Sequence, residues 1–314
     1  MLLGDGRQLL SFTAVCLMLA GAFAVFLASQ RHFLPHDTAY LGMDAKELCR
    51  FHECRIVNFM FHDRVAFGGT LIAIGILYLW LVASPLHDGE RWAWNAMATS
   101  GAMGFVSFLA YLGYGYLDTW HGMATLALLP FFLIGLVRTR RLISKPSPRS
   151  RVFSAAAHPH LRFGRWLLLA TAAGMMAAGA TILVVGMTTV FVPQDLHFMH
   201  VDPEALRKIS TRLIPLIAHD RAGFGGGLMA TGIIIMYCAW YAQGGRAFRQ
   251  AITMSGLAGF GCAIGIHFVE GYVDWGHLAP AIIGSVLFLL SIVLERSGAL
   301  RTADNGRGQR PRPQ

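Results

Sequence analysis

Eight stretches of this chain are rich in apolar residues and contain no Asp, Glu, Lys or Arg. They run at about 9–29, 65–84, 93–113, 121–137, 166–192, 222–242, 250–269 and 277–294. A helix needs about 20 apolar residues to cross the hydrocarbon core of a bilayer. Each stretch therefore predicts one transmembrane helix. Together they predict an all-α integral membrane protein with eight transmembrane helices.

The composition excludes the main alternatives to a membrane protein. Only 14% of the 314 residues are charged, 55% are hydrophobic, and the mean hydropathy is +0.51. Soluble proteins carry about 25% charged residues. The chain is therefore neither a soluble domain, nor a disordered chain, nor a disulfide-rich secreted module. The expected partner is the lipid bilayer. In a membrane protein the positions of basic residues determine its orientation, so the net charge of +9 does not indicate binding to a nucleic acid.

The positions of the basic residues predict the orientation. The segment 137–166 contains eight basic residues and no acidic one, and the C-terminal tail is also basic. Short loops rich in Lys and Arg lie on the cytoplasmic side. We therefore expect both termini in the cytoplasm of a bacterial-type plasma membrane. The loops at about 30–64, 114–120, 193–221 and 270–276 then face outward.

The two halves of the chain repeat one another, because short motifs recur at a nearly constant separation of 155 to 158 residues. The motifs that begin at Phe33, His62, Ser100 and Gly115 recur at Phe191, His219, Ser255 and Gly271. Each repeat has four predicted spans, so the halves share one orientation. We expect two duplicated four-helix bundles in parallel. The predicted domains are a first repeat at 1–140, a basic cytoplasmic linker at 141–165, a second repeat at 166–296 and a disordered cytoplasmic tail at 297–314.

Most of the repeated residues are ionisable, and all lie at the predicted outer side. Asp37, His62, Asp63, Arg64, Asp118 and His121 recur as Asp195, His219, Asp220, Arg221, Asp274 and His277. The His-Asp-Arg motifs are predicted to open the second and sixth spans. Near a bilayer an ionisable residue costs a few kcal/mol unless it is paired or hydrated. The set indicates either a functional site or a structural one, in which helix caps and pairs such as Arg64–Asp118 and Arg221–Asp274 join the helices.

The histidines carry the functional hypothesis. Each half has one on its second span and one on its fourth, so His62 can face His121, and His219 can face His277. Two neutral imidazoles suit the axial positions of a haem iron, or part of the ligand set of a transition metal. Interfacial packing of the four rings is the alternative interpretation. The predicted cofactor is haem b; otherwise it is a transition metal, or none.

Other charged residues have predicted roles around these ligands. Arg64 and Arg221 are suited to hold haem propionates through bidentate hydrogen bonds. Asp118 and Asp274 can orient the imidazoles through their second ring nitrogens. The candidate catalytic residues are Asp63, Asp220 and Glu270.

Two features distinguish the halves. His267 and Glu270 occur only in the second, and Cys49 and Cys54 occur only in the first, within its first outer loop. The two cysteines can form a disulfide on an oxidising side of the membrane or remain free thiols.

In this layout the chain resembles the heme A synthase family. Those enzymes have eight spans in two four-helix halves, a histidine pair on the second and fourth spans of each half, and commonly a cysteine pair in the first outer loop. The resemblance covers about residues 8–295. His62, His121, His219 and His277 take the places of the family's histidines, and Cys49 and Cys54 lie in its cysteine loop.

The resemblance implies haem ligation by these histidines. The chain differs at the family's second-span glutamate, where Asn58 stands nearby. It has His62-Asp63-Arg64 in place of the family's His-Arg dipeptide. The residue thought to be catalytic in the family is therefore missing here.

We predict a redox-linked membrane protein, in enzymatic terms a membrane oxidoreductase, that exchanges electrons with a quinone or porphyrin. The alternatives are a proton- or cation-coupled transporter that uses Asp63 and Asp220, and a non-catalytic assembly factor with other membrane proteins as partners.

Overall fold

The computed structural model describes residues 4–110, 116, 119–144, 146 and 159–308, and within them all regular structure is helical. The long helices are α1 (Arg7–Ser29), α4 (Arg55–Ala83), α5 (Arg91–Ala110), α6 (Thr119–Thr139), α7 (Pro159–Met187), α10 (Leu213–Tyr241), α11 (Arg246–Glu270) and α12 (Trp275–Gly308). The short ones are α2 (Pro35–Leu41), α3 (Ala45–Leu48), α8 (Pro193–Met199) and α9 (Pro203–Ile209), with 3₁₀ turns η1 (His52–Cys54) and η3 (Arg140–Leu142).

Seven of the long helices in the described part are long and apolar enough to cross a membrane. They are α1, α4, α6, α7, α10, α11 and α12. The eighth long helix, α5, is 20 residues long and is not among the seven. It carries Asn95, Thr99 and Ser100 on the segment predicted as the third span. The structure is therefore that of a multi-spanning helical membrane protein.

Helices α4 and α10 form the centre of the molecule. In the most apolar stretch of α4, 67% of the residues are buried, and in that of α10, 72%, against 28% or less in the other five. Because the two central helices are surrounded by protein, they can carry ionisable side chains that a lipid-facing helix could not.

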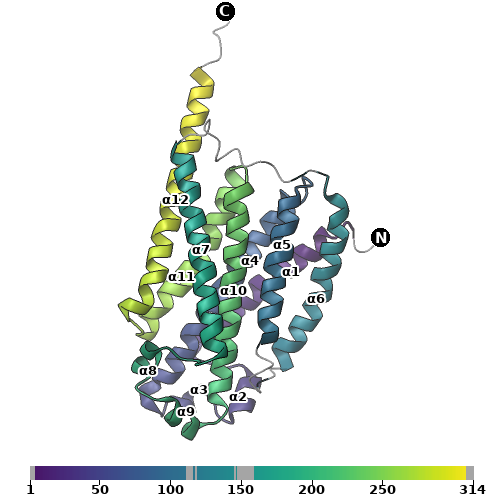
Figure 1. Cartoon of the computed structure of the whole chain (residues 1–314). Helices are drawn as coiled ribbons and strands as arrows, with labels where there is room; N and C mark the ends of the chain where they lie inside the picture. Colours follow the sequence, from purple (N-terminus) through teal and green to yellow (C-terminus); the bar gives the residue numbers. More distant parts are fainter. Residues whose placement is uncertain (1–3, 111–115, 117–118, 145, 147–158, 309–314) are drawn as a thin grey trace, which may run out of the picture.

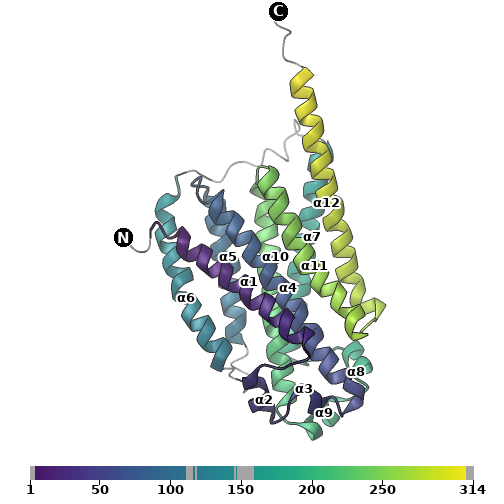
Figure 2. The ribbon, with the colours of Figure 1, turned by 180° about the vertical axis from the view of Figure 1, so that it is seen from behind.

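The central helices pack against helices of both halves of the chain. Helix α4 contacts α1 of its own half and α11 of the other, and α10 contacts α7 of its own half and α5 of the other. Helices α4 and α10 also contact each other (Figures 1 and 2). Side chains on α4 therefore face residues that lie about 200 positions later in the chain.

Glycines allow the closest of these helix approaches. A Cβ atom on Gly68 of α4 would lie 2.7 Å from the Gly21 carbonyl oxygen of α1. At the matching crossing, a Cβ on Gly179 of α7 would lie 2.6 Å from the carbonyl oxygen of Gly225 on α10. Such distances exclude any side chain at these positions, so the repeated glycines allow the backbones to meet.

The short helices gather at one end of the bundle, opposite the C-terminal end of α12 (Figure 1). Prolines begin three of them, Pro35 in α2, Pro193 in α8 and Pro203 in α9. Proline suits the first turn of a helix, because the N–H it lacks would have no partner there. This end corresponds to the side predicted to face outward.

The helices are longer than the sequence predicts. Helix α4 begins at Arg55 and α10 at Leu213, where starts near 65 and 222 were predicted. The His-Asp-Arg motifs therefore lie inside the two central helices and do not open them. The charged residues are accommodated because partners from neighbouring helices neutralise them, as described below.

The basic segments also differ from their prediction. Residues 159–165 of the predicted linker belong to α7, and residues 147–158 lie outside the described part. Helix α12 continues to Gly308, so residues 297–308 are helical where the sequence predicts disorder. This segment continues α12 without a break and contains no proline to end the helix.

Candidate functional site

The repeated His-Asp-Arg motifs are buried where α4 and α10 meet. His62 and Asp63 are both 3% exposed, and His219, Asp220 and Arg221 are between 5% and 8% exposed. Consecutive helix residues point about 100° apart. Each motif can therefore reach several neighbouring helices at once.

Two arginines and four aspartates form a matched network of ion pairs. Arg64 of α4 contacts Asp220 of α10 at 2.8 Å and Asp37 of α2 at 2.8 Å. The counterpart, Arg221 of α10, contacts Asp63 of α4 at 3.1 Å and Asp195 of α8 at 2.8 Å. Each arginine thus pairs with one aspartate of its own half and one of the other half.

Tyrosines complete the network on both sides. The hydroxyl of Tyr116 donates to Asp37 at 2.6 Å, and that of Tyr272 donates to Asp195 at 2.7 Å. Burial, together with the neighbouring Asp195, raises the pKa of the Tyr272 phenol. It therefore stays protonated and remains a donor.

Three histidines meet beside this network, between α4, α11 and α12. The Nε2 atoms of His62 and His267 lie 3.0 Å apart. The ring of His277 lies 5.3 Å from that of His267 and 5.9 Å from that of His62, centre to centre. One nitrogen from each ring lies within 4.8 Å of the others.

The Tyr272 loop determines which nitrogen of His267 carries a proton. Nδ1 of His267 lies 2.8 Å from the carbonyl oxygen of Tyr272, which can only accept a hydrogen bond. Nδ1 of His62 lies 3.3 Å from Oδ1 of Asp63 but makes no hydrogen bond within the described part of the chain. With a proton on its Nδ1, neutral His267 directs an Nε2 lone pair at Nε2 of His62 across 3.0 Å. A proton on His62 Nε2 or a cation bound by both nitrogens satisfies that contact.

The shortest of these separations fits a metal ion better than a haem. Two ligands on opposite sides of a metal, each at a typical metal–nitrogen length of about 2 Å, lie about 4 Å apart. Two adjacent ligands of a tetrahedral ion lie about 3.3 Å apart. The 3.0 Å between His62 and His267 is closer to the second value. A carbonyl and a carboxylate behind the imidazoles are also the usual outer partners of metal-bound histidines.

The observed histidine cluster corrects the predicted pairing within each half. His277 lies beside His62 and His267 and was expected beside His219, whose ring is 5.2 Å from that of Tyr116. The cause is the packing of α4 against α11. Asp118 and the side chain of His121 lie outside the described residues, so the pairing of His62 with His121 is untested.

The arginine and aspartate roles also differ from expectation. Arg64 and Arg221 each contact two carboxylates, so they are not placed as partners for propionates. The expected pair Arg221–Asp274 is not formed, because Asp274 instead accepts the backbone N–H of His277 at 2.7 Å. Asp274 thus caps α12 and does not contact the imidazole ring. Asp63 and Asp220, predicted as catalytic candidates, are both bound to arginine.

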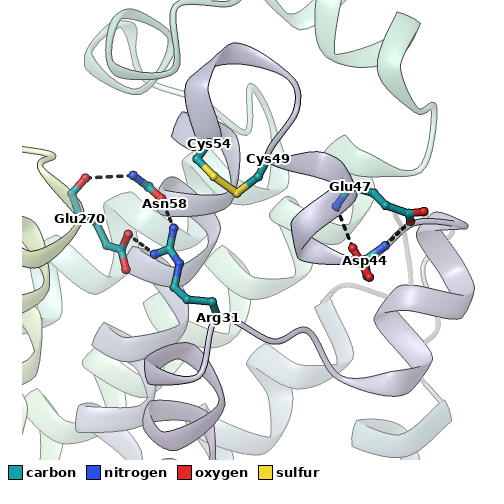
Figure 3. The surroundings of a disulfide bond; sticks show 7 residues. All are labelled: Arg31, Asp44, Glu47, Cys49, Cys54, Asn58 and Glu270. Atoms are coloured by element: carbon teal, nitrogen blue, oxygen red, sulfur yellow. Dashed lines mark hydrogen bonds and ion pairs between the residues drawn. A yellow bond between two sulfur atoms is a disulfide. The ribbon is translucent and has the colours of Figure 1, made fainter.

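Glu270 lies one turn beyond His267 and forms a second polar layer between α4 and α11. Arg31 donates to the Glu270 carboxylate at 2.6 Å and also contacts the Asn58 side chain. The Asn58 amide donates to the Glu270 backbone carbonyl at 3.4 Å (Figure 3). Glu270 is therefore tied to an arginine beside the histidine cluster.

The two outer-loop cysteines form a disulfide, which decides between the two states left open by the sequence. The bond between Cys49 and Cys54 closes a small loop just before α4 (Figure 3). Three successive residues of that loop have positive φ: His52 at 49°, Glu53 at 53° and Cys54 at 64°. The loop precedes the segment of α4 that carries Asn58 and His62.

Sequence reasoning identified His267 only as a feature of the second half. Its role became visible through the contact between α4 and α11, which no local pattern encodes. No family model, curated relative or solved structure matches the chain. The heme A synthase resemblance therefore stays a prediction.

Proposed function

We propose that this protein is an integral membrane protein that binds a transition-metal ion through His62, His267 and His277. The observation that carries the proposal is the meeting of three histidines, in which the Nε2 atoms of His62 and His267 lie 3.0 Å apart and the Tyr272 carbonyl holds Nδ1 of His267. Imidazole nitrogen is a preferred ligand of zinc, copper, iron and nickel. The pair of imidazoles is better matched to such an ion than to the haem b suggested by the sequence.

Each residue has a defined part in holding the ion. The Tyr272 carbonyl orients His267, and the Asp63 carboxylate lies beside the His62 ring. Asp63 also supplies a negative charge near the ion, and Arg221 fixes its position. Three protein ligands leave one position of a tetrahedral ion open, the arrangement found in catalytic metal sites. A bound iron or copper ion supplies one-electron chemistry, the basis for a redox-linked role and for a membrane oxidoreductase.

The membrane arrangement is part of the proposal. Eight spans, with α5 as the third, form two duplicated four-helix repeats in parallel. Supporting observations are the matched Arg–Asp network and the matched glycine crossings. Both termini face the cytoplasm of a bacterial-type plasma membrane, because the basic residues collect at the end of the bundle away from the short helices. The histidine centre then lies near the outer face.

Metal titration of the purified full-length protein tests the site. After treatment with a chelator, Co²⁺ is added and the visible absorption of the cobalt is followed, with Zn²⁺ as competitor. We expect one Co²⁺ per chain, displaced by Zn²⁺. His267→Ala should weaken Co²⁺ binding at least tenfold. His87→Ala should not, because the His87 side chain is 58% exposed and pairs only with its neighbour Asp88.

Two results would overturn the proposal. One is Co²⁺ binding by His267→Ala as tight as by the wild type. The other is a Soret absorption band in the purified protein that His62→Ala abolishes, which would establish haem b at the same residues.

A further inference from the structure

A cavity of about 410 Å³ lies between four helices of the first half, α1, α4, α5 and α6, and α10 of the second. It is separate from the three-histidine cluster and shares no residue with it. Most of its lining is apolar, and small residues leave the space open, among them Ala20, Ala24, Gly101, Gly104 and Gly227.

The cavity is long. Along α4 its lining extends from Arg64 to Tyr78, which is about 21 Å at the helical rise per residue. An extended hydrocarbon chain can lie along such a space.

The outer end of the cavity is polar and negatively charged. Arg64 and Asp220 line it together with His32 and His219, and Arg64 also pairs with Asp37. Among the described residues, two carboxylates therefore flank the one arginine, which opposes an anionic head such as a carboxylate or phosphate. Arg64 uses Nε and Nη1 for the two aspartates, and Nη2 carries further N–H donors. The end therefore suits a neutral head that accepts hydrogen bonds.

At the opposite end, the lining residues that the structure describes carry no charge. There the hydroxyls of Tyr78 and Ser100 lie 2.8 Å apart and bond to each other. With their polar groups paired, these residues present little to a polar ligand. The cavity therefore has a defined direction, with the head of a ligand at Arg64 and its tail toward Tyr78.

We propose that this cavity binds one neutral, single-chain lipid of the isoprenoid quinone class, with a head carbonyl directed at Arg64. Phospholipids carry a phosphate and fatty acids carry a carboxylate, so neither head matches an arginine that two carboxylates already flank. The proposal does not depend on metal binding at the histidines.

The matching helix in the second half of the chain suggests a substitution that would fill the cavity. The glycine crossings align α1 with α7 at a separation of 158 residues, as in Gly21 and Gly179. Ala24 then corresponds to Ile182 of α7. Ala24→Ile introduces a side chain that the matching helix already carries, directed into the cavity. Ala22→Ile is the matched control, because Ala22 is exposed on the same helix and does not line the cavity.

Native mass spectrometry of the full-length protein in detergent tests the proposal. The probes are decylubiquinone, palmitate and hexadecane, which offer a neutral head, an anionic head and no head. We expect one decylubiquinone per chain and at least tenfold weaker binding of the other two. Ala24→Ile should weaken decylubiquinone binding at least tenfold and Ala22→Ile less than twofold. Asp220→Asn should improve palmitate binding relative to decylubiquinone.

Three outcomes would overturn the inference. Equal decylubiquinone binding by Ala24→Ile and Ala22→Ile would place the ligand elsewhere. Equal binding of hexadecane and decylubiquinone would show burial of a chain without recognition of its head. Palmitate binding as tight as that of decylubiquinone would refute the role of the negative outer end.

Discussion

Arg64 of α4 donates through Nε to Asp220 of α10 at 2.8 Å, and the contact joins the two halves of the chain inside the bundle. Arg221 and Asp63 make the same contact in the opposite direction. Each arginine serves two carboxylates, so its removal leaves two buried negative charges without their counter-ion.

We predict that Arg64→Met destabilises the protein by about 3 to 5 kcal/mol, the typical cost of breaking a buried pair from one side. Thermal unfolding in detergent measures the effect. The control is Lys208→Ala, because Lys208 and Glu204 form a pair whose side chains are 75% and 74% exposed. Such exposed pairs contribute about 0–1 kcal/mol. Similar unfolding temperatures for the two variants would contradict a stabilising role of the network.

Helix α7 offers a test of the glycine crossings. We expect Gly179→Ala to destabilise, because its Cβ would lie 2.6 Å from the Gly225 carbonyl oxygen. Gly174→Ala, on the same helix, has no neighbour within 4 Å of the new Cβ. It should stabilise by roughly 0.5 to 1 kcal/mol, because alanine favours helix over glycine. The two unfolding temperatures should therefore move in opposite directions. A shift of the same sign in both variants would show that the crossing is not tight.

A second buried ion pair lies near the other end of the bundle, between Arg165 of α7 and Glu295 of α12. Arg165 is fully buried and also donates to the carbonyl oxygen of Cys238 at 2.7 Å. Arg165→Met should cost about 3 to 5 kcal/mol, because it leaves Glu295 buried and unpaired. The double variant Arg165→Met/Glu295→Gln should recover part of that loss. A double variant no more stable than Arg165→Met would show that charge pairing is not the cause.

The disulfide between Cys49 and Cys54 should stabilise the outer loop modestly. For the short loop that it closes, the chain-entropy estimate is about 2 kcal/mol. We expect Cys49→Ser and Cys54→Ser to lower the unfolding temperature equally, since either change removes the bond. A reductant should lower that of the wild type and leave both variants unchanged. A reductant effect on the variants would assign the loss to another group.

Local patterns in the sequence predict much of the fold. Uncharged apolar runs correctly placed seven membrane-span-like helices, because the length of such a run is a local property. The starts of α4 and α10 were wrong by about ten residues. Charged residues there are neutralised by distant partners, which a hydropathy pattern does not register.

The sequence predicted most residues of the candidate site, but it did not predict which of them contact one another. The repeat identified His62, His277, Arg64 and Arg221 as a related set. It predicted partners within each half, because each repeat was expected to form a separate four-helix bundle. The contact of α4 with α11 reverses that assignment and brings in His267, which has no histidine counterpart in the first half.

The cross-packing of the central helices has a consequence for biosynthesis. His62 enters the membrane early, whereas His267 and His277 lie on the last two helices to be made. The three-histidine cluster therefore cannot form before the chain extends past His277. A product truncated after α10 would retain His62 and both His-Asp-Arg motifs and still lack two of the three histidines. The proposed metal loading would thus follow synthesis of the last helix.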